Sequence, residues 1–257
     1  MSRVRQALPA ALLIAGLIGI WELYVDLHGS SFFLILPPPH QVARALFDDR
    51  SLLWRSFLVT AEEVLLGILV ATAFGALFSV AIHFSPTLRR AVYPLLVASQ
   101  AVPVVVLAPI LTFWLGFGLL PKLVVVTIVS FFSIVVATTA GLAAVDPDLL
   151  KLMRTFDAPR LRTFWHVELP SALPSVFTGA KIAVAVSVIG AVLAEYLGSN
   201  SGLGYVILVS EPQLLVARGV AAVVILSLFA IALFSLLSLA ERLALPWAYR
   251  TRDAVPS

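Results

Sequence analysis

The chain contains no cysteine, and this absence excludes disulfide bonds, thiolate metal sites and cysteine nucleophiles. Charged residues are also scarce, because they make up 12% of the sequence against 61% hydrophobic residues. A typical water-soluble domain has about a quarter of its residues charged, so lipid is the expected solvent for most of this chain. No glycine-rich loop ending in Gly-Lys-Ser or Gly-Lys-Thr is present. The chain therefore has no motif of its own for binding ATP phosphates.

No low-complexity tract or Gly/Ser-rich linker interrupts the 257 residues, although the chain has 14 glycines and 16 prolines. These residues must lie within or between ordered apolar segments. We therefore expect a single membrane domain over residues 1–257.

Six apolar runs are long enough to cross about 30 Å of hydrocarbon. They cover residues 8–25, 57–83, 92–115, 119–145, 176–197 and 219–243. The runs predict an all-α, polytopic membrane protein with about six transmembrane helices and a core over residues 57–243. Pro103 and Pro109 each remove a backbone donor within the third run, so we expect that helix to be kinked or broken. Arg3 and Arg5 before the first run also resemble a secretory signal, but no small-x-small cleavage site follows, which favours an uncleaved first helix.

Basic residues are unevenly divided between the two sets of connections. With the N-terminus inside, twelve of the 17 lysines and arginines fall on the inner side and five on the outer side. The positive-inside rule then predicts a multi-pass protein of the cell membrane, with both termini and the connection 146–175 in the cytoplasm. Lys181, near the start of the fifth run, is expected to snorkel towards the interface. In the outer connection 26–56, three consecutive prolines precede a predicted short amphipathic helix within 41–53, with a structural role at the interface.

The connection 146–175 has the pattern of a helix–turn–helix. Asp146 can cap a helix over 149–156. Asp157 can end that helix and N-cap the next one, because aspartate tolerates left-handed backbone, and Pro159 then falls in the first turn. The second helix has an apolar side for the membrane domain, which consists of Leu161, Phe164, Val167 and Leu169. The alternative is a solvated basic loop.

The end of this connection, Val167-Glu168-Leu169-Pro170, resembles the loop of binding-protein-dependent ABC importer permeases. The pattern of that loop is Glu-Ala-Ala, three residues, Gly, nine residues, Ile, one residue, Leu-Pro. Aligned on this chain, the terminal Ile falls on Val167, the central Gly on Asp157, and the opening triplet on Lys151-Leu152-Met153. The second half of the pattern matches and the first half departs from it.

The resemblance extends over most of the chain, from Leu36 to Arg242. Several stretches are similar to the nitrate, sulfonate, taurine and thiamine-precursor branch of these permeases, namely Gln100-Ala101-Val102-Pro103, Gly116-Phe117-Gly118, Ala194-Glu195 and Gly202-Leu203-Gly204. Within that branch, Ser99-Gln100, residues 152–156 and 187–190, and the stretch 204–214 are most similar to permeases for the thiamine pyrimidine precursor.

The resemblance implies a type I ABC importer permease fold and a transport subunit that is not itself an enzyme. The implied partners are a second permease subunit, expected to be an identical copy, two cytoplasmic ATP-binding subunits and an extracytoplasmic solute-binding protein. ATP and Mg²⁺ would bind to the partner ATPase, and this chain would bind no cofactor. The chain would contact membrane lipid and would not bind nucleic acid. The solute would be small, polar and organic, either a thiamine pyrimidine precursor or a sulfonate, taurine or nitrate type of substrate.

Two groups of residues are candidates for function. We expect the inner connection to couple to the ATPase through Lys151, Arg154, Thr155, Phe156, Asp157, Ala158, Pro159, Arg160, Arg162, Thr163, Leu169 and Pro170. Candidates for the translocation path are Ser99, Gln100, Pro103, Ser130, Ser133 and Glu195. Membrane hydroxyls also hold helices together, and Glu62 and Glu63 could form a structural pair or be solvated at the interface.

Two other classes of protein remain as alternatives. A secondary transporter usually has an inverted repeat with ionisable residues at mid-membrane, and neither feature is evident in the sequence. A membrane-embedded enzyme would need paired carboxylates, a metal cluster or a Ser/His couple within the spans. The four histidines all fall in loops or at span ends, which argues against such an enzyme.

Overall fold

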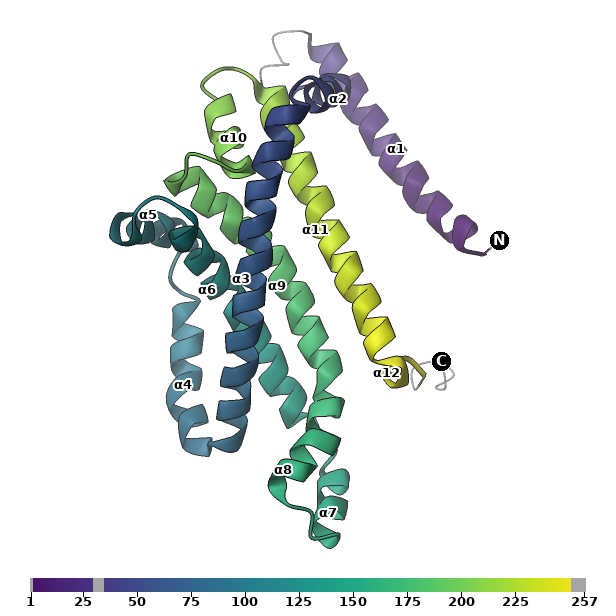
Figure 1. Ribbon diagram of the computed structural model, residues 1–257. Coiled ribbons are helices and arrows are strands. Elements are labelled where there is room, and N and C mark those ends of the chain that lie inside the picture. Colours follow the sequence, from purple (N-terminus) through teal and green to yellow (C-terminus); the bar gives the residue numbers. More distant parts are fainter. Residues whose placement is uncertain (1, 30–34, 251–257) are drawn as a thin grey trace. The chain divides into compact units, whose positions relative to one another are not determined.

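The computed structural model describes residues 2–29 and 35–250, and within these ranges every regular element is a helix (Figure 1). The all-α prediction is confirmed. The chain divides into two compact units, of which unit 1 comprises Met1–Thr60 with Asn200–Ser227 and unit 2 comprises Ala61–Ser199 with Leu228–Ser257. Two long helices, α3 (Arg50–Phe84) and α11 (Val216–Ala244), each contribute to both units.

Three helices in the described residues belong to unit 1 alone, namely α1 (Ser2–His28), α2 (Pro39–Asp48) and α10 (Leu203–Ser210). α1 coincides with the first predicted span, and the imidazole of His40 at the start of α2 is hydrogen-bonded to the Glu22 carboxylate on α1. The amphipathic helix predicted within 41–53 ends earlier than expected, because Asp49 leaves helical geometry with φ −93° and ψ 13°. The residues that follow belong to α3, which therefore begins seven residues before the predicted second span, with Leu53 buried on its inner side.

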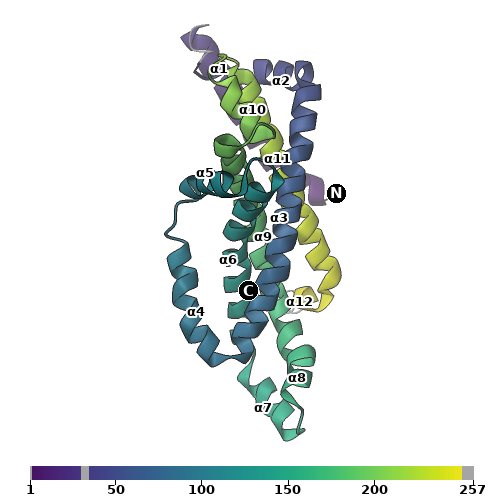
Figure 2. The same cartoon turned by 60° about the vertical axis from the view of Figure 1, so that its left-hand side comes forward.

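Unit 2 contains the other helices. They are α4 (Pro86–Ser99), α5 (Val104–Leu115), α6 (Leu119–Ala143), α7 (Pro147–Thr155), α8 (Arg160–Thr163), a π-helical turn η2 (Phe164–Glu168), α9 (Leu169–Gly198) and α12 (Pro246–Arg250). α6 and α9 pack along each other, and α5 crosses both of them. In both views α7 and α8 extend beyond the ends of α6 and α9 (Figures 1 and 2).

Four helical segments in the described residues are long and apolar enough to cross a bilayer, namely α3, α6, the continuous run 160–198 and α11. α4 and α5 together would make a fifth span, but they are bent by 97° to each other. The break predicted in the third run is confirmed at Pro103, which immediately precedes α5. Pro109 lies inside α5 without ending it, so only one of the two prolines breaks the helix.

Glycines allow α6 and α9 to approach closely. A Cβ on Gly179 would lie 2.6 Å from the Ala137 Cβ and 2.9 Å from the Ser133 carbonyl oxygen, and a Cβ on Gly190 would lie 2.8 Å from Val129. Real Cβ atoms do not approach this closely, so larger residues at either position would force the helices apart. The α6–α9 pair is therefore a tightly packed element of unit 2.

Candidate functional site

The segment from Asp146 to Pro170 forms a helical hairpin, as the sequence predicts. Asp146 caps α7, because its side chain accepts a hydrogen bond from the Asp148 backbone N–H at 2.8 Å. Lys151 forms an ion pair of 2.7 Å with Asp148 one turn earlier. The acidic groups lie at the N-terminal end of α7 and Arg154 lies in its last turn, an arrangement that the helix dipole favours.

Asp157 ends α7 in a left-handed conformation, with φ +50°. The Asp157 N–H donates to the Arg154 carbonyl at 3.0 Å, and the Ala158 N–H donates to the Met153 carbonyl at 3.1 Å. These two bonds form a Schellman motif, in which glycine is the usual left-handed residue. Asp157 thus makes the turn that the family pattern assigns to glycine. Its predicted second role is wrong, because α8 is N-capped by Pro159 and no side chain caps it.

The hairpin is attached to the end of α3 in unit 2. Phe164 is buried against Leu142, Ala172 and Phe84, and the Arg160 guanidinium lies over the Phe84 ring, 5.0 Å from its centroid. The attachment therefore consists of an aromatic cluster with a cation stacked on it.

A polar contact supports the same attachment, since His83 Nε2 and Glu168 Oε2 are hydrogen-bonded at 2.8 Å. Glu168 ends the π-helical turn, in which the Leu169 N–H bonds to the Phe164 carbonyl. Pro170 follows directly, and its ring would crowd the carbonyl of His166 in a regular α-helix. The wider turn accommodates this proline, so α8, η2 and α9 form one continuous helix.

The tip of the hairpin exposes apolar and basic side chains together. Phe156 is 72% exposed, and Leu161 is 62% exposed, so its predicted place on the side facing the membrane domain is wrong. Phe164, Val167 and Leu169 do occupy that side, as buried or half-buried residues. Large exposed apolar residues rimmed by charge mark interaction surfaces.

Eight of the twelve predicted coupling residues are exposed on the hairpin, namely Lys151, Arg154, Thr155, Phe156, Asp157, Pro159, Arg160 and Arg162. Ala158 and Thr163 are half-buried, and so are Leu169 and Pro170 in the first turn of α9. The structure therefore brings the twelve residues into one feature. Its guanidinium and aromatic groups are the types enriched at binding hot spots.

The six residues predicted for a translocation path are dispersed. Ser99 and Gln100 lie exposed at the end of α4, and Pro103 immediately precedes α5. Ser130 is fully buried on α6 and its hydroxyl has no hydrogen-bond partner within the described chain, whereas Ser133 is half-buried. Glu195 is fully buried on α9. None of these residues lines the cavity beside α2, the cavity bordered by α3, α9 and α11, or the cavity between α4 and α6.

Sequence reasoning missed a buried ion pair between α3 and α6. The Lys122 ammonium is hydrogen-bonded to the Glu63 carboxylate, and both residues are buried, at 4% and 0% exposure. The Glu63 carboxyl also interacts with that of Glu195, so the cluster joins α3, α6 and α9. The structural pair considered for Glu63 is present, whereas Glu62 is exposed. Opposite charges near the ends of two apolar runs were the available signal, but Lys122 was counted among the five basic residues of the outer side.

A second, partly buried ion pair involves Lys181 on α9. Its ammonium is paired with the Glu241 carboxylate on α11 and lies over the Phe234 ring, 5.8 Å from the centroid. Lys181 therefore links α9 to α11, and its expected extension to the interface stays a prediction.

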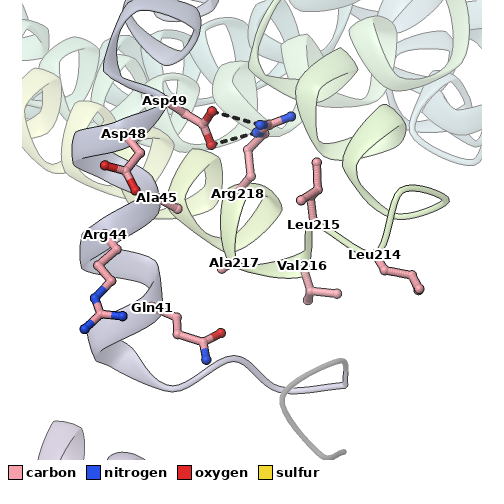
Figure 3. A pocket seen from close by; sticks show the side chains of 10 residues that line it. All are labelled: Gln41, Arg44, Ala45, Asp48, Asp49, Leu214, Leu215, Val216, Ala217 and Arg218. Atoms are coloured by element: carbon pink, nitrogen blue, oxygen red, sulfur yellow. Dashed lines mark hydrogen bonds and ion pairs between the residues drawn. The ribbon is translucent and has the colours of Figure 1, made fainter. Parts of the chain in front are cut away.

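Unit 1 contains a cavity of about 310 Å³ beside α2, lined by both polar and apolar residues. Figure 3 shows Asp49 and Arg218 joined by two hydrogen bonds, from Nε to Oδ2 at 2.7 Å and from Nη2 to Oδ1 at 2.8 Å. Arg44 extends away from this pair in the same view. A two-pronged arginine–carboxylate pair fixes orientation as well as distance, so it holds the start of α11 against the end of α2.

A family described as "Binding-protein-dependent transport system inner membrane component" matches residues 63–246. The chain belongs to this family. It is 36% identical over 248 residues to the formylaminopyrimidine transport permease protein ThiX of Halalkalibacterium halodurans, a match that covers 96% of this chain and 98% of the relative.

More distant relatives support the same assignment. The chain is 32% identical to the riboflavin transport system permease protein RibX of Chloroflexus aurantiacus, over 93% of this chain and 89% of the relative. It is 27% identical to the taurine transport system permease protein TauC of Escherichia coli, over 83% and 80%. The predicted branch of ABC importer permeases is confirmed.

A solved structure of the MetNI methionine ABC transporter has the same fold. Its matching chain has a TM-score of 0.63 at 19% identity, over 77% of this chain and 97% of that chain. The permease is thus a multi-pass transport subunit of an ABC importer and not an enzyme, and its family implies ATP-binding subunits and a substrate-binding protein as partners.

Proposed function

We propose that this permease forms the membrane pathway of an ATP-driven importer for a formylaminopyrimidine-type solute, a small polar heterocycle. The observation that carries this proposal is the 36% identity to a formylaminopyrimidine permease over nearly the full length of both chains. The riboflavin permease, whose solute is also a nitrogen heterocycle, is 32% identical. Taurine and sulfonate permeases are less similar, at 26–27%, so an alkylsulfonate is the second candidate.

The uptake experiment uses cells that lack their own pyrimidine-precursor uptake and express the permease with its ATP-binding subunit and its solute-binding protein. We expect accumulation of labelled formylaminopyrimidine that an excess of unlabelled compound abolishes and an excess of taurine leaves unchanged. Accumulation of taurine instead of the pyrimidine would contradict the proposed solute but not the transport role.

The α7–α8 hairpin is the proposed contact with the ATP-binding subunit. On the predicted topology both termini and the hairpin lie in the cytoplasm, and two permease copies form the pathway. Closure of the paired ATPases would then move the hairpins and switch the pathway between inward-open and outward-open states. The exposed Phe156 and the basic residues around it support this role, because they offer an anchor and charge complementarity to a groove.

The coupling test replaces Phe156 by Ala. We expect the permease to reach the membrane in normal amount while uptake falls at least tenfold, because a central aromatic anchor contributes about 2 kcal/mol or more to an interface. Phe47→Ala on α2 is the matched control, since Phe47 is similarly exposed, at 69%, but lies far from the hairpin in the sequence. Equal uptake by the two variants would show that the tip of the hairpin does not contact the ATP-binding subunit.

The orientation has its own test. A membrane-impermeant thiol reagent should label Arg162→Cys only after the cells are opened, because this chain has no native cysteine to confuse the result. Labelling of intact cells would reverse the topology and remove the hairpin from the ATPase.

A further inference from the structure

α4 packs against the rest of unit 2 with only one of its sides. Leu88, Val92 and Leu96 on that side contact the cluster of Ile82 and Val135 from α3 and α6. The other side borders a cavity of about 640 Å³. The cavity is lined by Pro86, Arg89, Arg90, Tyr93 and Pro94 from α4 and by Val136, Thr139, Ala140 and Ala143 from α6.

The cavity carries positive charge without a counter-charge. The guanidinium groups of Arg89 and Arg90 make no hydrogen bond or ion pair with other described residues, and no aspartate or glutamate lines the cavity. The Thr139 hydroxyl also borders the cavity, is shielded from solvent and has no hydrogen-bond partner in the described chain. Two guanidinium groups and a donor hydroxyl suit an anion with several oxygens, such as a phosphate group.

The wall of the cavity distinguishes a lipid from a free anion. Val136, Ala140 and Ala143 form an apolar surface on α6, one of the membrane-spanning helices. A free phosphate would leave this surface in water, whereas the glycerol and upper acyl chain of a phospholipid would cover it. Tyr93, with an apolar ring and a polar hydroxyl, is typical of the boundary between headgroups and hydrocarbon.

We infer that this cavity binds an anionic phospholipid, with the phosphate held by Arg89 and Arg90 and the upper acyl chain against α6. Basic pockets between membrane helices are known to select such headgroups. The cavity borders the first turns of α4 and the last turns of α6. That end of α6 leads directly into α7, so the bound lipid would occupy the leaflet next to the hairpin. The inference does not depend on the identity of the solute.

The binding experiment uses the purified full-length permease in a neutral detergent. Short-chain phosphatidylglycerol, short-chain phosphatidylcholine and inorganic phosphate are titrated separately, and the change in thermophoresis gives an apparent Kd for each. We expect phosphatidylglycerol to bind, and Arg89→Gln/Arg90→Gln to weaken its binding about 25-fold, from roughly fivefold for each basic residue near an anionic headgroup. Arg55→Gln is the single-charge control, because Arg55 is exposed on α3 outside the cavity.

A second variant tests the apolar wall without changing charge. Ala140 is exposed in the cavity wall, so Ala140→Leu adds bulk where space is available, and it should weaken phosphatidylglycerol binding while the protein keeps its elution volume. Wild-type affinity in both cavity variants, or equal affinity for phosphatidylcholine, would overturn the inference. So would displacement of the lipid by equimolar inorganic phosphate, or a dimer-to-monomer shift of the double arginine variant, which would identify the cavity as a contact between subunits.

Discussion

The buried pair of Glu63 and Lys122 gives the sharpest test of how this fold is held together. Lys122→Met removes the ammonium and keeps a side chain of similar length. The Glu63 carboxylate is then left buried without its cation, beside the Glu195 carboxyl. Removing one partner of a buried ion pair lowers the free energy of unfolding by about 3–5 kcal/mol. At about 2–4 °C per kcal/mol for a chain of this size, the unfolding temperature should fall by about 6–20 °C.

A double-mutant cycle measures the interaction free energy of Glu63 and Lys122 apart from the effects of each substitution on its surroundings. Glu63→Gln should cost less than Lys122→Met, because the amide oxygen that replaces the Glu63 carboxylate can still accept a hydrogen bond from the Lys122 ammonium. The double variant should be more stable than Lys122→Met alone, since it leaves no unpaired charge at Glu63. Fluorescence-detected size-exclusion chromatography after heating measures all three in the same detergent.

Lys151→Met is the matched control for this cycle. Lys151 also pairs with a carboxylate, that of Asp148, but both side chains are well exposed. Loss of an exposed pair costs about 1 kcal/mol or less. If Lys122→Met were as stable as Lys151→Met, the pair would not be shielded from water and the account of this cluster would be wrong.

Three further predictions concern backbone and packing. Asp157→Gly should stabilise the hairpin by about 1 kcal/mol and Asp157→Val should destabilise it by a similar amount or more, because a side chain raises the cost of the left-handed conformation; protease sensitivity of the hairpin would rank the three proteins. Gly179→Leu should reduce the amount of folded permease severely, because any Cβ there already collides with Ala137 and the Ser133 carbonyl; a normal elution profile would contradict the close packing. Arg218→Ala should lower stability by about 1 kcal/mol, since its two-pronged pair with Asp49 is partly exposed; an unchanged melting temperature would show that the pair contributes nothing.

Local chemistry was readable from the sequence where one or two residues decide the structure. Asp146 as a helix cap and Asp157 as a left-handed stop follow from properties of single side chains, and both are present in the hairpin. The break in the third run was also foreseeable, because proline removes a donor. The sequence could not show which of Pro103 and Pro109 would break the helix. The outcome depends on whether neighbouring groups tolerate the backbone carbonyl that each proline leaves without a donor.

Long-range pairing was beyond the reach of the sequence. Glu63 and Lys122 are 59 positions apart, and Lys181 and Glu241 are 60 apart, so only the packing of the helices decides that they meet.

The misplacement of Leu161 has a local cause. The π-helical turn that follows Leu161 shifts the helical phase relative to a regular α-helix, and an argument from helical spacing cannot anticipate such a shift.

The uninterrupted helix from Arg160 to Gly198 gives the permease a mechanical lever. The sequence separation between Arg160 and Glu195 corresponds to about 50 Å at the rise of an α-helix. On the proposed coupling, a displacement of the hairpin would reach the buried charge cluster through this one helix. The π-helical turn lies between α8 and α9, near the hairpin end of this helix. A small change in its winding would rotate α9 relative to the hairpin.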